Sequence, residues 1–256
     1  MEPHRWDVSP TEAAAIQRAL RSRLIAEDDP PDLRRRTRVV AGVDNAYVRM
    51  PDGGVLAVGV AVALSFPELD LLDTISTTTP VRFPYVPGLL AFREVPAMLA
   101  ALAGLRVSPD LVLVDAHGYA HPRRFGAASH LGVLIDRPTI GCAKSRLVGR
   151  YAALDSERGA SAPLVDDGET IGMVVRTRAG GAPLFVSVGH RVSLATAVEL
   201  ALACCRPDSR GSVPEPTRLA DRRTKDEARR LRAASSVAPQ AKPSRKRSGS
   251  ASGASP

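Results

Sequence analysis

One short, wholly apolar run constrains the fold of this chain more than any other feature. Leu111-Val112-Leu113-Val114 is too short for a helix, contains no polar residue, and is followed directly by Asp115. Such a run is typical of a strand that is buried on both faces in the middle of a helix-covered sheet. We therefore expect an α/β protein with Asp115 at the carboxyl end of a central strand, where open α/β sheets place their active sites.

The segments around that run predict how the rest of the sheet is built. Three β-branched stretches joined by turns predict an antiparallel meander, and helical and strand patterns alternate after it. The expected strands are 38–44, 55–64, 69–79, 111–114, 138–144, 170–177 and 184–188. The expected helices start at Pro10 with a Ser9/Glu12 capping box, at Pro96, at Gly126, and after a Ser193 cap.

The net charge of +8 is unevenly distributed along the 256 residues. Residues 1–205 contain 22 Lys+Arg and 22 Asp+Glu, whereas residues 206–256 contain 13 and 5. The basic character therefore says little about the folded part of the chain. We expect one catalytic domain over 1–223 and a basic, mostly disordered tail over 224–256, with disorder from about residue 233.

Cysteine usage and the amino terminus favour an intracellular setting. The three cysteines are Cys142, Cys204 and Cys205, an odd number without metal-ligand spacing. Residues 1–10 contain no apolar leader core, and no stretch reaches the roughly 20 apolar residues of a membrane span. We expect a cytoplasmic protein with no membrane partner.

Three acidic residues lie where strands are expected to end or helices to begin. Asp44 follows a β-branched run, Glu94 precedes the helix expected from Pro96, and Asp115 follows the apolar run. Each has a structural alternative, since Asp44 could cap a turn and Glu94 could interact with a helix dipole. If the three converge, they can all be ionised only beside cations.

Hard carboxylate oxygens select Mg²⁺, with Mn²⁺ able to substitute. A metal held by a few carboxylates and bridging a phosphate is the usual arrangement for phosphodiester cleavage. The sequence therefore offers Asp44, Glu94 and Asp115 as a candidate metal-binding set for a nuclease.

Five basic side chains follow the expected strands: His121, Arg123, Arg124, Lys144 and His190. In a nuclease, arginine and lysine would hold phosphates on either side of the scissile bond. His190 lies between a strand and a helix and could orient water or bind metal. The alternative is that these cations form salt bridges with the acids.

The loop 84–88 carries an aromatic side chain between prolines. Pro84 and Pro87 restrict the backbone on both sides of Tyr85 and Val86. A stiff loop with an aromatic tip suits a wedge that replaces a base pulled out of the stack. The alternative is an ordinary proline-rich surface loop.

Taken together, these residues resemble the endonuclease V family, the deoxyinosine 3′ endonucleases. The matching segments are GVDNAY (42–47), PYVPGLLAFREVP (84–96), VDAHGYAHPRRFGAASHLGV (114–133), PTIGCAK (138–144), GHRVS (189–193) and PEPTRLAD (214–221). The resemblance covers about residues 6–223. It implies an RNase H-like mixed sheet, an antiparallel meander plus parallel strands, with helices on both faces.

The resemblance also implies roles for single residues. Asp44, Glu94 and Asp115 correspond to the family's metal-binding acids, Lys144 to its site lysine, His190 to its later catalytic histidine and Tyr85 to its wedge. The expected pocket for the base is lined by Tyr85, Pro87, Gly88, Leu90, Ala116, His121, Arg123 and Ala143. Ala116 stands where the family's usual motif is Val-Asp-Gly, so its methyl group should tighten the pocket or shift the preference among deaminated bases.

Enzymes of this family hydrolyse the second phosphodiester bond on the 3′ side of a deaminated base, chiefly hypoxanthine, and leave 3′-hydroxyl and 5′-phosphate ends. Extruding that base is favoured because an inosine pair is weaker than a normal pair. The implied partner is DNA containing deaminated bases, bound by a monomer. Two alternatives remain: an endonuclease for inosine-containing RNA or for single strands, and a protein that binds nucleic acid without cutting it.

Overall fold

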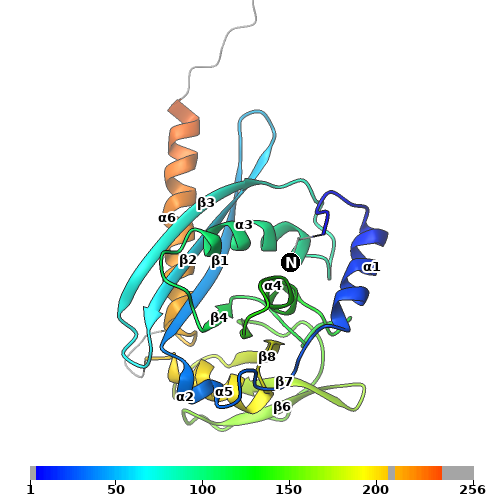
Figure 1. Cartoon of the computed structure of the whole chain (residues 1–256), viewed down its shortest axis with the longest axis vertical. Helices are drawn as coiled ribbons and strands as arrows, with labels where there is room; N and C mark the ends of the chain where they lie inside the picture. Colours follow the sequence, from blue (N-terminus) through cyan, green and yellow to red (C-terminus); the bar gives the residue numbers. More distant parts are fainter. Residues whose placement is uncertain (1–3, 207–210, 238–256) are drawn as a thin grey trace, which may run out of the picture.

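The structure of the protein, a computed structural model, describes residues 4–206 and 211–237 (Figure 1). One mixed sheet of eight strands has the order β3-β2-β1-β4-β5-β8-β7-β6. The strands are β1 (Val39–Arg49), β2 (Val55–Ser65), β3 (Leu71–Pro80), β4 (Leu111–Val114), β5 (Thr139–Ala143), β6 (Ser161–Asp166), β7 (Glu169–Val175) and β8 (Leu184–His190). The helices are α1 (Pro10–Arg21), α2 (Leu33–Arg36), α3 (Ala91–Ala103), α4 (Ala127–Ile135), α5 (Leu194–Ala203) and α6 (Glu215–Val237).

The expected antiparallel meander and parallel strands are confirmed. β1, β2 and β3 pair antiparallel, while β1, β4 and β5 pair parallel. The run ending at Val114 is the short central strand β4, and all four of its residues are buried. The carboxyl ends of β4 and β5 therefore lie side by side, immediately before Asp115 and Lys144.

Helices cover both faces of the sheet, as expected. On one face, Ala41 and Val43 of β1 pack with side chains of α3 and α4. On the other face, Val40 of β1 and Leu113 of β4 belong to the core that includes side chains of α5 and α6. Gly42 is required here, since a Cβ at this position would overlap the carbonyl group of Pro216 at the start of α6. Close contact between β1 and α6 follows from that glycine.

Two expected boundaries near the acids are wrong. The helix expected from Pro96 begins earlier, at Ala91, because Phe92, Val95 and Met98 continue one buried face across the proline. Strand β1 does not end before Asp44 but continues to Arg49, paired with β2 throughout. Asp44 nevertheless lies at the end of a ladder, because the parallel pairing of β1 with β4 stops one residue earlier, at Val43 and Val114.

The boundary expected at 223/224 falls inside a continuous helix. Helix α6 runs to Val237 and passes beside β1 and β2 (Figure 1). Ala220, Thr224 and Ala228 recur at helical spacing and are all buried, which ties the extension to the sheet. The rest of the expected tail, 238–256, lies outside the described residues.

Two short elements were not expected from the sequence. Edge strand β6 contains Pro163, which weakens a strand pattern. Helix α2 has only four residues. Among the described residues, none of the helices combines the length and apolar character needed to cross a membrane.

Candidate active site

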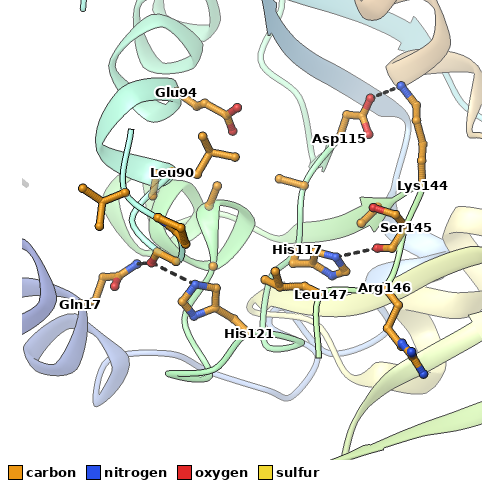
Figure 2. Close-up of a pocket in the computed structure, with 18 of the residues that line it drawn as sticks. Gln17, Leu90, Glu94, Asp115, His117, His121, Lys144, Ser145, Arg146 and Leu147 are labelled. Atoms are coloured by element: carbon orange, nitrogen blue, oxygen red, sulfur yellow. Dashed lines mark hydrogen bonds and ion pairs between the residues drawn. The ribbon is translucent and has the colours of Figure 1, made fainter. Parts of the chain in front are cut away.

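A cavity of about 430 Å³ opens beside the carboxyl ends of β4 and β5. Its walls come from loop 84–88, the start of α3, and the segments that follow β4 and β5 (Figure 2). Glu94 points into this region from α3, and Asp115 and Lys144 face it from the sheet side. The lining includes Tyr85, Pro87, Gly88, Leu90, Ala116, His121 and Ala143, seven of the eight residues expected to bind the base.

Backbone register brings two of the expected acids together. The Asp115 amide donates a hydrogen bond of 3.4 Å to the carbonyl of Val43, the residue before Asp44. Lys144, which follows β5, forms an ion pair with Asp115 (Figure 2). The Thr224 hydroxyl of α6 donates to Asp44 at 2.8 Å. The four elements β1, β4, β5 and α6 therefore hold these side chains together at the carboxyl ends of β4 and β5.

The acids are costly to ionise together. Burial raises the pKa of Glu94 to about 8, and the charges of Asp44 and Asp115 add to the effect. Burial also raises the pKa of Asp44 to about 6, with a further contribution from Asp115 and partial opposition from Thr224. The pKa of Asp115 is raised by burial as well, although Lys144 opposes it. A cation among these groups would remove the repulsion.

Asp221 is a fourth acid beside this site, and it was not among the residues predicted from the sequence. Its carboxylate lies 3.5 Å from the Lys144 ammonium and 2.6 Å from that of Lys225. Burial alone would raise the pKa of Asp221, but Lys225 and Lys144 outweigh burial and lower it. The available signal was the buried spacing of Ala220, Thr224 and Ala228, which predicts a helix with Asp221 at the margin of its buried face.

His190 does not reach this site. Strand β8 is antiparallel to β5, so the end of β8 lies at the start of β5, where His190 is opposite Thr139. The ring is 2% exposed; it accepts a hydrogen bond from the Ile25 amide at 3.2 Å and contacts Asp136 at 3.3 Å. The prediction that His190 joins the acids is therefore corrected, because an antiparallel strand end points to the opposite edge.

The cavity walls combine one exposed aromatic side chain with a tightly held backbone. Tyr85 is 72% exposed at the tip of its loop. Gly88 has a φ of 76°, and its carbonyl lies 3.1 Å from the His121 ring and also accepts from Arg123. Burial lowers the pKa of His121 to about 4, with Arg123 contributing, so this histidine is neutral at physiological pH.

Gln17 holds the same wall and was also missed. It is buried, and its side-chain amide donates to the carbonyls of Gly88 and Phe125 at 3.2 Å each. Its side-chain carbonyl accepts from Arg123 at 2.7 Å. Arg123 therefore supports the pocket from behind rather than lining it. The amphipathic pattern of α1 gave no sign that a buried glutamine would serve the distant Gly88 loop.

Of the expected cations, Lys144 pairs with the candidate acids, through Asp115 and Asp221, whereas Arg124 pairs with acids elsewhere. Arg124 bonds to Asp166 at 2.8 Å and to Glu169 at 2.7 Å, near the β6–β7 turn. These acids are not the ones at the sheet edge. Arg124 therefore fixes the loop after β4 to β6 and β7.

The donor set suits a hard divalent cation. Carboxylate oxygens of Asp44, Glu94, Asp115 and Asp221 are the ligands that such ions prefer. Within the described part of the chain, no three acidic, histidine or cysteine side chains are already grouped closely enough to hold a metal ion. Asp115 and Asp44 are instead bonded to Lys144 and Thr224. The raised pKa values of Glu94 and Asp44 fit a site that gains a positive charge when it is loaded.

Fold and site together define the class: an RNase H-like protein with acidic side chains at the carboxyl ends of its central parallel strands. The family model for endonuclease V matches residues 18–222. Endonuclease V of Nostoc punctiforme is 49% identical over 219 residues, which are 86% of this chain and 95% of that protein. The chain belongs to the endonuclease V family and is an endonuclease, an enzyme that hydrolyses phosphodiester bonds.

Solved structures agree with this assignment. Endonuclease V from Streptomyces avermitilis has a TM-score of 0.80 and 44% identity, covering 91% of this chain and 97% of that one. Ciona intestinalis endonuclease V, in complex with a 24mer DNA containing an inosine followed by a ribo-adenosine, has a TM-score of 0.73 and 29% identity. That alignment covers 86% of this chain and 98% of the Ciona chain.

Proposed function

We propose that this enzyme recognises a deaminated base in DNA, chiefly deoxyinosine, and hydrolyses the second phosphodiester bond on its 3′ side, using Mg²⁺. The observation that carries the proposal is a cavity of about 430 Å³, large enough to admit a base, that opens directly beside a crowded set of acids. The inosine-containing DNA bound by the Ciona relative supports the choice of substrate.

The chain's own residues divide the work. Tyr85 is placed to fill the gap left by an extruded base, and Gly88, Leu90 and Ala116 form walls around that base. The Gly88 carbonyl is fixed by Gln17, so the wall keeps its position when a base enters. Selectivity then depends on small side chains that leave room for one flat ring.

Asp44, Glu94, Asp115 and Asp221 would hold the metal at the neighbouring edge. A bound divalent cation supplies activation of the attacking water and neutralisation of charge on the leaving oxygen. Lys144 orients Asp115 through their ion pair and brings a positive charge close to the phosphate. Because α6 supplies both Asp221 and Thr224, the catalytic unit includes this helix.

The test is nicking of a duplex with a single deoxyinosine, with cut sites mapped at nucleotide resolution. We expect cleavage that depends on Mg²⁺ and is also supported by Mn²⁺. The cut should fall at the second phosphodiester bond on the 3′ side of the lesion and leave 3′-hydroxyl and 5′-phosphate ends. Asp115→Asn should abolish cleavage while leaving the fold intact. Equal nicking by Asp115→Asn and wild type would contradict the proposal.

A second candidate substrate is inosine-containing RNA. The Ciona complex favours it, since the DNA bound there carries a ribo-adenosine after the inosine. Matched DNA and RNA oligonucleotides, single-stranded and duplex, should be compared by kcat/KM. A clear preference for RNA would shift the assignment to an endoribonuclease.

We also propose a monomer that acts in the cytoplasm. All three cysteines, Cys142, Cys204 and Cys205, are buried and none forms a disulfide, which fits a reducing compartment. Light scattering would test the monomer, and fractionation of cells would test the location.

A further inference from the structure

Helix α6 carries a row of basic side chains on one flank. Arg222, Lys225, Arg229 and Arg232 follow the spacing i, i+3, i+7 and i+10, which places them on one side of a helix. All four are exposed, with the side chains of Lys225 and Arg229 at 65% and 77%. We name these four residues the α6 basic stripe.

The stripe lies on the flank of α6 that faces the acids. Its member Lys225 bonds to Asp221, which in turn lies 3.5 Å from the Lys144 ammonium. At the far end, Arg232 donates to the carbonyl of Tyr47 at 2.9 Å. Lys225 and Arg232 therefore contact groups on the same side of α6 as the candidate site, and the row leads away from that site along β1.

The remaining basic residues of this part of α6 lie on another flank. Arg223 and Arg230 are also exposed, and at about 100° per residue they project away from the stripe. Arg229 pairs with Asp226 at 3.1 Å and Arg230 pairs with Glu227 at 2.8 Å, each over three residues. Such exposed pairs contribute little to stability, so helix stabilisation does not explain why four basic residues gather on one flank.

A row of cations beside a nuclease site fits one kind of partner. From Arg222 to Arg232 the stripe extends about 15 Å along the helix axis, which matches roughly four steps of a DNA strand at about 3.4 Å per step. Arginine and lysine bind phosphate oxygens and carry no base preference, so they suit contacts at any sequence. A backbone that leaves the base pocket and crosses the acids reaches α6 next.

We propose that the α6 basic stripe binds the phosphate backbone of the DNA arm on the 3′ side of the cut. This inference rests on the proposed function, since the direction of the arm follows from cleavage 3′ to the lesion. The stripe would hold the strand beyond the scissile bond, while loop 84–88 and the pocket hold the lesion. It adds affinity and position without adding base specificity.

The chain offers a matched pair of variants for the test. Arg222→Gln/Arg229→Gln removes two charges from the stripe, and Arg223→Gln/Arg230→Gln removes two charges from the other flank. Each double variant loses one exposed pair with a carboxylate three residues earlier, so the two should have equal thermal stability. Both are made in the full chain, and circular dichroism confirms that α6 is retained.

Binding is measured without divalent metal on deoxyinosine duplexes over about 50 to 200 mM salt. We expect the stripe variant to lower the slope of log K against log[salt] by about 2, at roughly 0.9 per lost phosphate contact. Shortening the 3′ arm of the duplex should weaken DNA binding by wild type and by the other-flank variant, but should have little effect on binding by the stripe variant. Shortening the 5′ arm should affect all three equally.

Equal salt slopes for the two double variants, or an unchanged dependence on the 3′ arm in the stripe variant, would overturn the inference. The same preparations are assayed for Mg²⁺-dependent nicking. A wild type that does not nick the deoxyinosine duplex would contradict the proposed function itself. A wild type that nicks, with stripe and other-flank variants binding alike, would contradict the stripe alone.

Discussion

Carboxylates and cations lie at both ends of the central parallel strands β4 and β5, but their environments differ. We call the carboxyl ends of these strands the carboxyl edge and the opposite ends the far edge. At the carboxyl edge of β4 and β5, burial raises the pKa of Asp44, Glu94 and Asp115. At the other edge, Asp28 accepts from the Ser193 amide at 2.7 Å, and Asp110 accepts from the amides of Arg38 and Val39 at 2.8 and 2.9 Å. Asp28 and Asp110 therefore stabilise the backbone of the segments that they contact.

Histidine and arginine at the far edge follow the same pattern. His190 contacts Asp136, and Arg191 forms ion pairs with both Asp136 and Asp29. Acids that bind backbone amides or Arg191 stabilise loops, whereas buried acids that repel one another are suited to bind a cation. Burial beside other acids, rather than position after a strand, distinguishes the carboxylates of the candidate site from the structural ones.

Lys144 and Arg191 each form an ion pair with a carboxylate, one at each end of the strands, and replacing them should have different effects. Lys144→Met should lower the single-turnover nicking rate by about a hundredfold, the scale of a lost electrostatic contact in an active site, with little change in Tm. Arg191→Met should lower Tm and leave the rate per folded molecule within a few-fold of wild type. Loss of activity in Arg191→Met as large as in Lys144→Met would show that the two edges do not differ in function.

The free energy of unfolding without bound metal should also differ between the two edges. The pKa of Glu94 is raised from 4.5 to about 8, so the folded protein loses stability as pH rises through that window. The free energy of unfolding of metal-free Glu94→Gln should therefore exceed that of wild type at pH 8, by up to about 4 kcal/mol at roughly 1.4 kcal/mol per pKa unit, and should equal it at pH 4. Asp29→Asn at the far edge should be destabilised at pH 8 instead.

Urea denaturation with and without Mg²⁺ checks this prediction. Mg²⁺ should stabilise wild type more than Glu94→Gln, since the variant has lost both a ligand and a repulsive charge. A Glu94→Gln protein that is less stable than wild type at pH 8 would indicate that Glu94 is held by structural contacts.

The far edge should have the opposite pH dependence. Burial lowers the pKa of His190, so the unfolded chain takes up a proton near pH 6.5 that the folded chain resists. Stability from this group is present above that pH and is lost as pH falls. Between pH 7 and pH 5, His190→Gln should lose less stability than wild type, by up to about 1 kcal/mol. Parallel stability curves for the two proteins would contradict this role.

The smallest effect concerns which base enters the pocket. Ala116 lines the cavity directly after Asp115. Ala116→Gly should change the ratio of kcat/KM for xanthine-containing over inosine-containing duplexes severalfold in favour of the larger base, since one methyl group is worth about 1 kcal/mol. The rate on inosine should stay within a few-fold of wild type. An unchanged ratio would remove Ala116 from base selection.

Local patterns in the sequence predicted most of the fold. The Ser9 capping box, the Ser193 cap and the buried strand before Asp115 are all present, because each depends on neighbouring residues. Pro96 misplaced the start of α3, since burial of Phe92 and Val95 extends the helix past a proline that removes one of its hydrogen bonds. Helix α6 was missed because its exposed face is highly charged and resembles a disordered tail.

The site was predictable where it depended on strands that run in one direction. Asp115 and Lys144 follow neighbouring parallel strands, so their proximity follows from the alternating pattern. His190 follows an antiparallel strand, and its direction depends on pairing between β5 and β8 that no local pattern reveals. Asp221 arrives through packing of α6 on Gly42, a contact between distant segments.

The most direct test of the account compares Asp221→Ala with His190→Gln in single-turnover nicking of a deoxyinosine duplex over a Mg²⁺ titration. We expect Asp221→Ala to lose at least about tenfold in rate and to require more Mg²⁺, the scale seen when a group around a bound metal is removed. His190→Gln should retain the wild-type rate and Mg²⁺ dependence per folded molecule. An inactive His190→Gln beside a fully active Asp221→Ala would contradict the account.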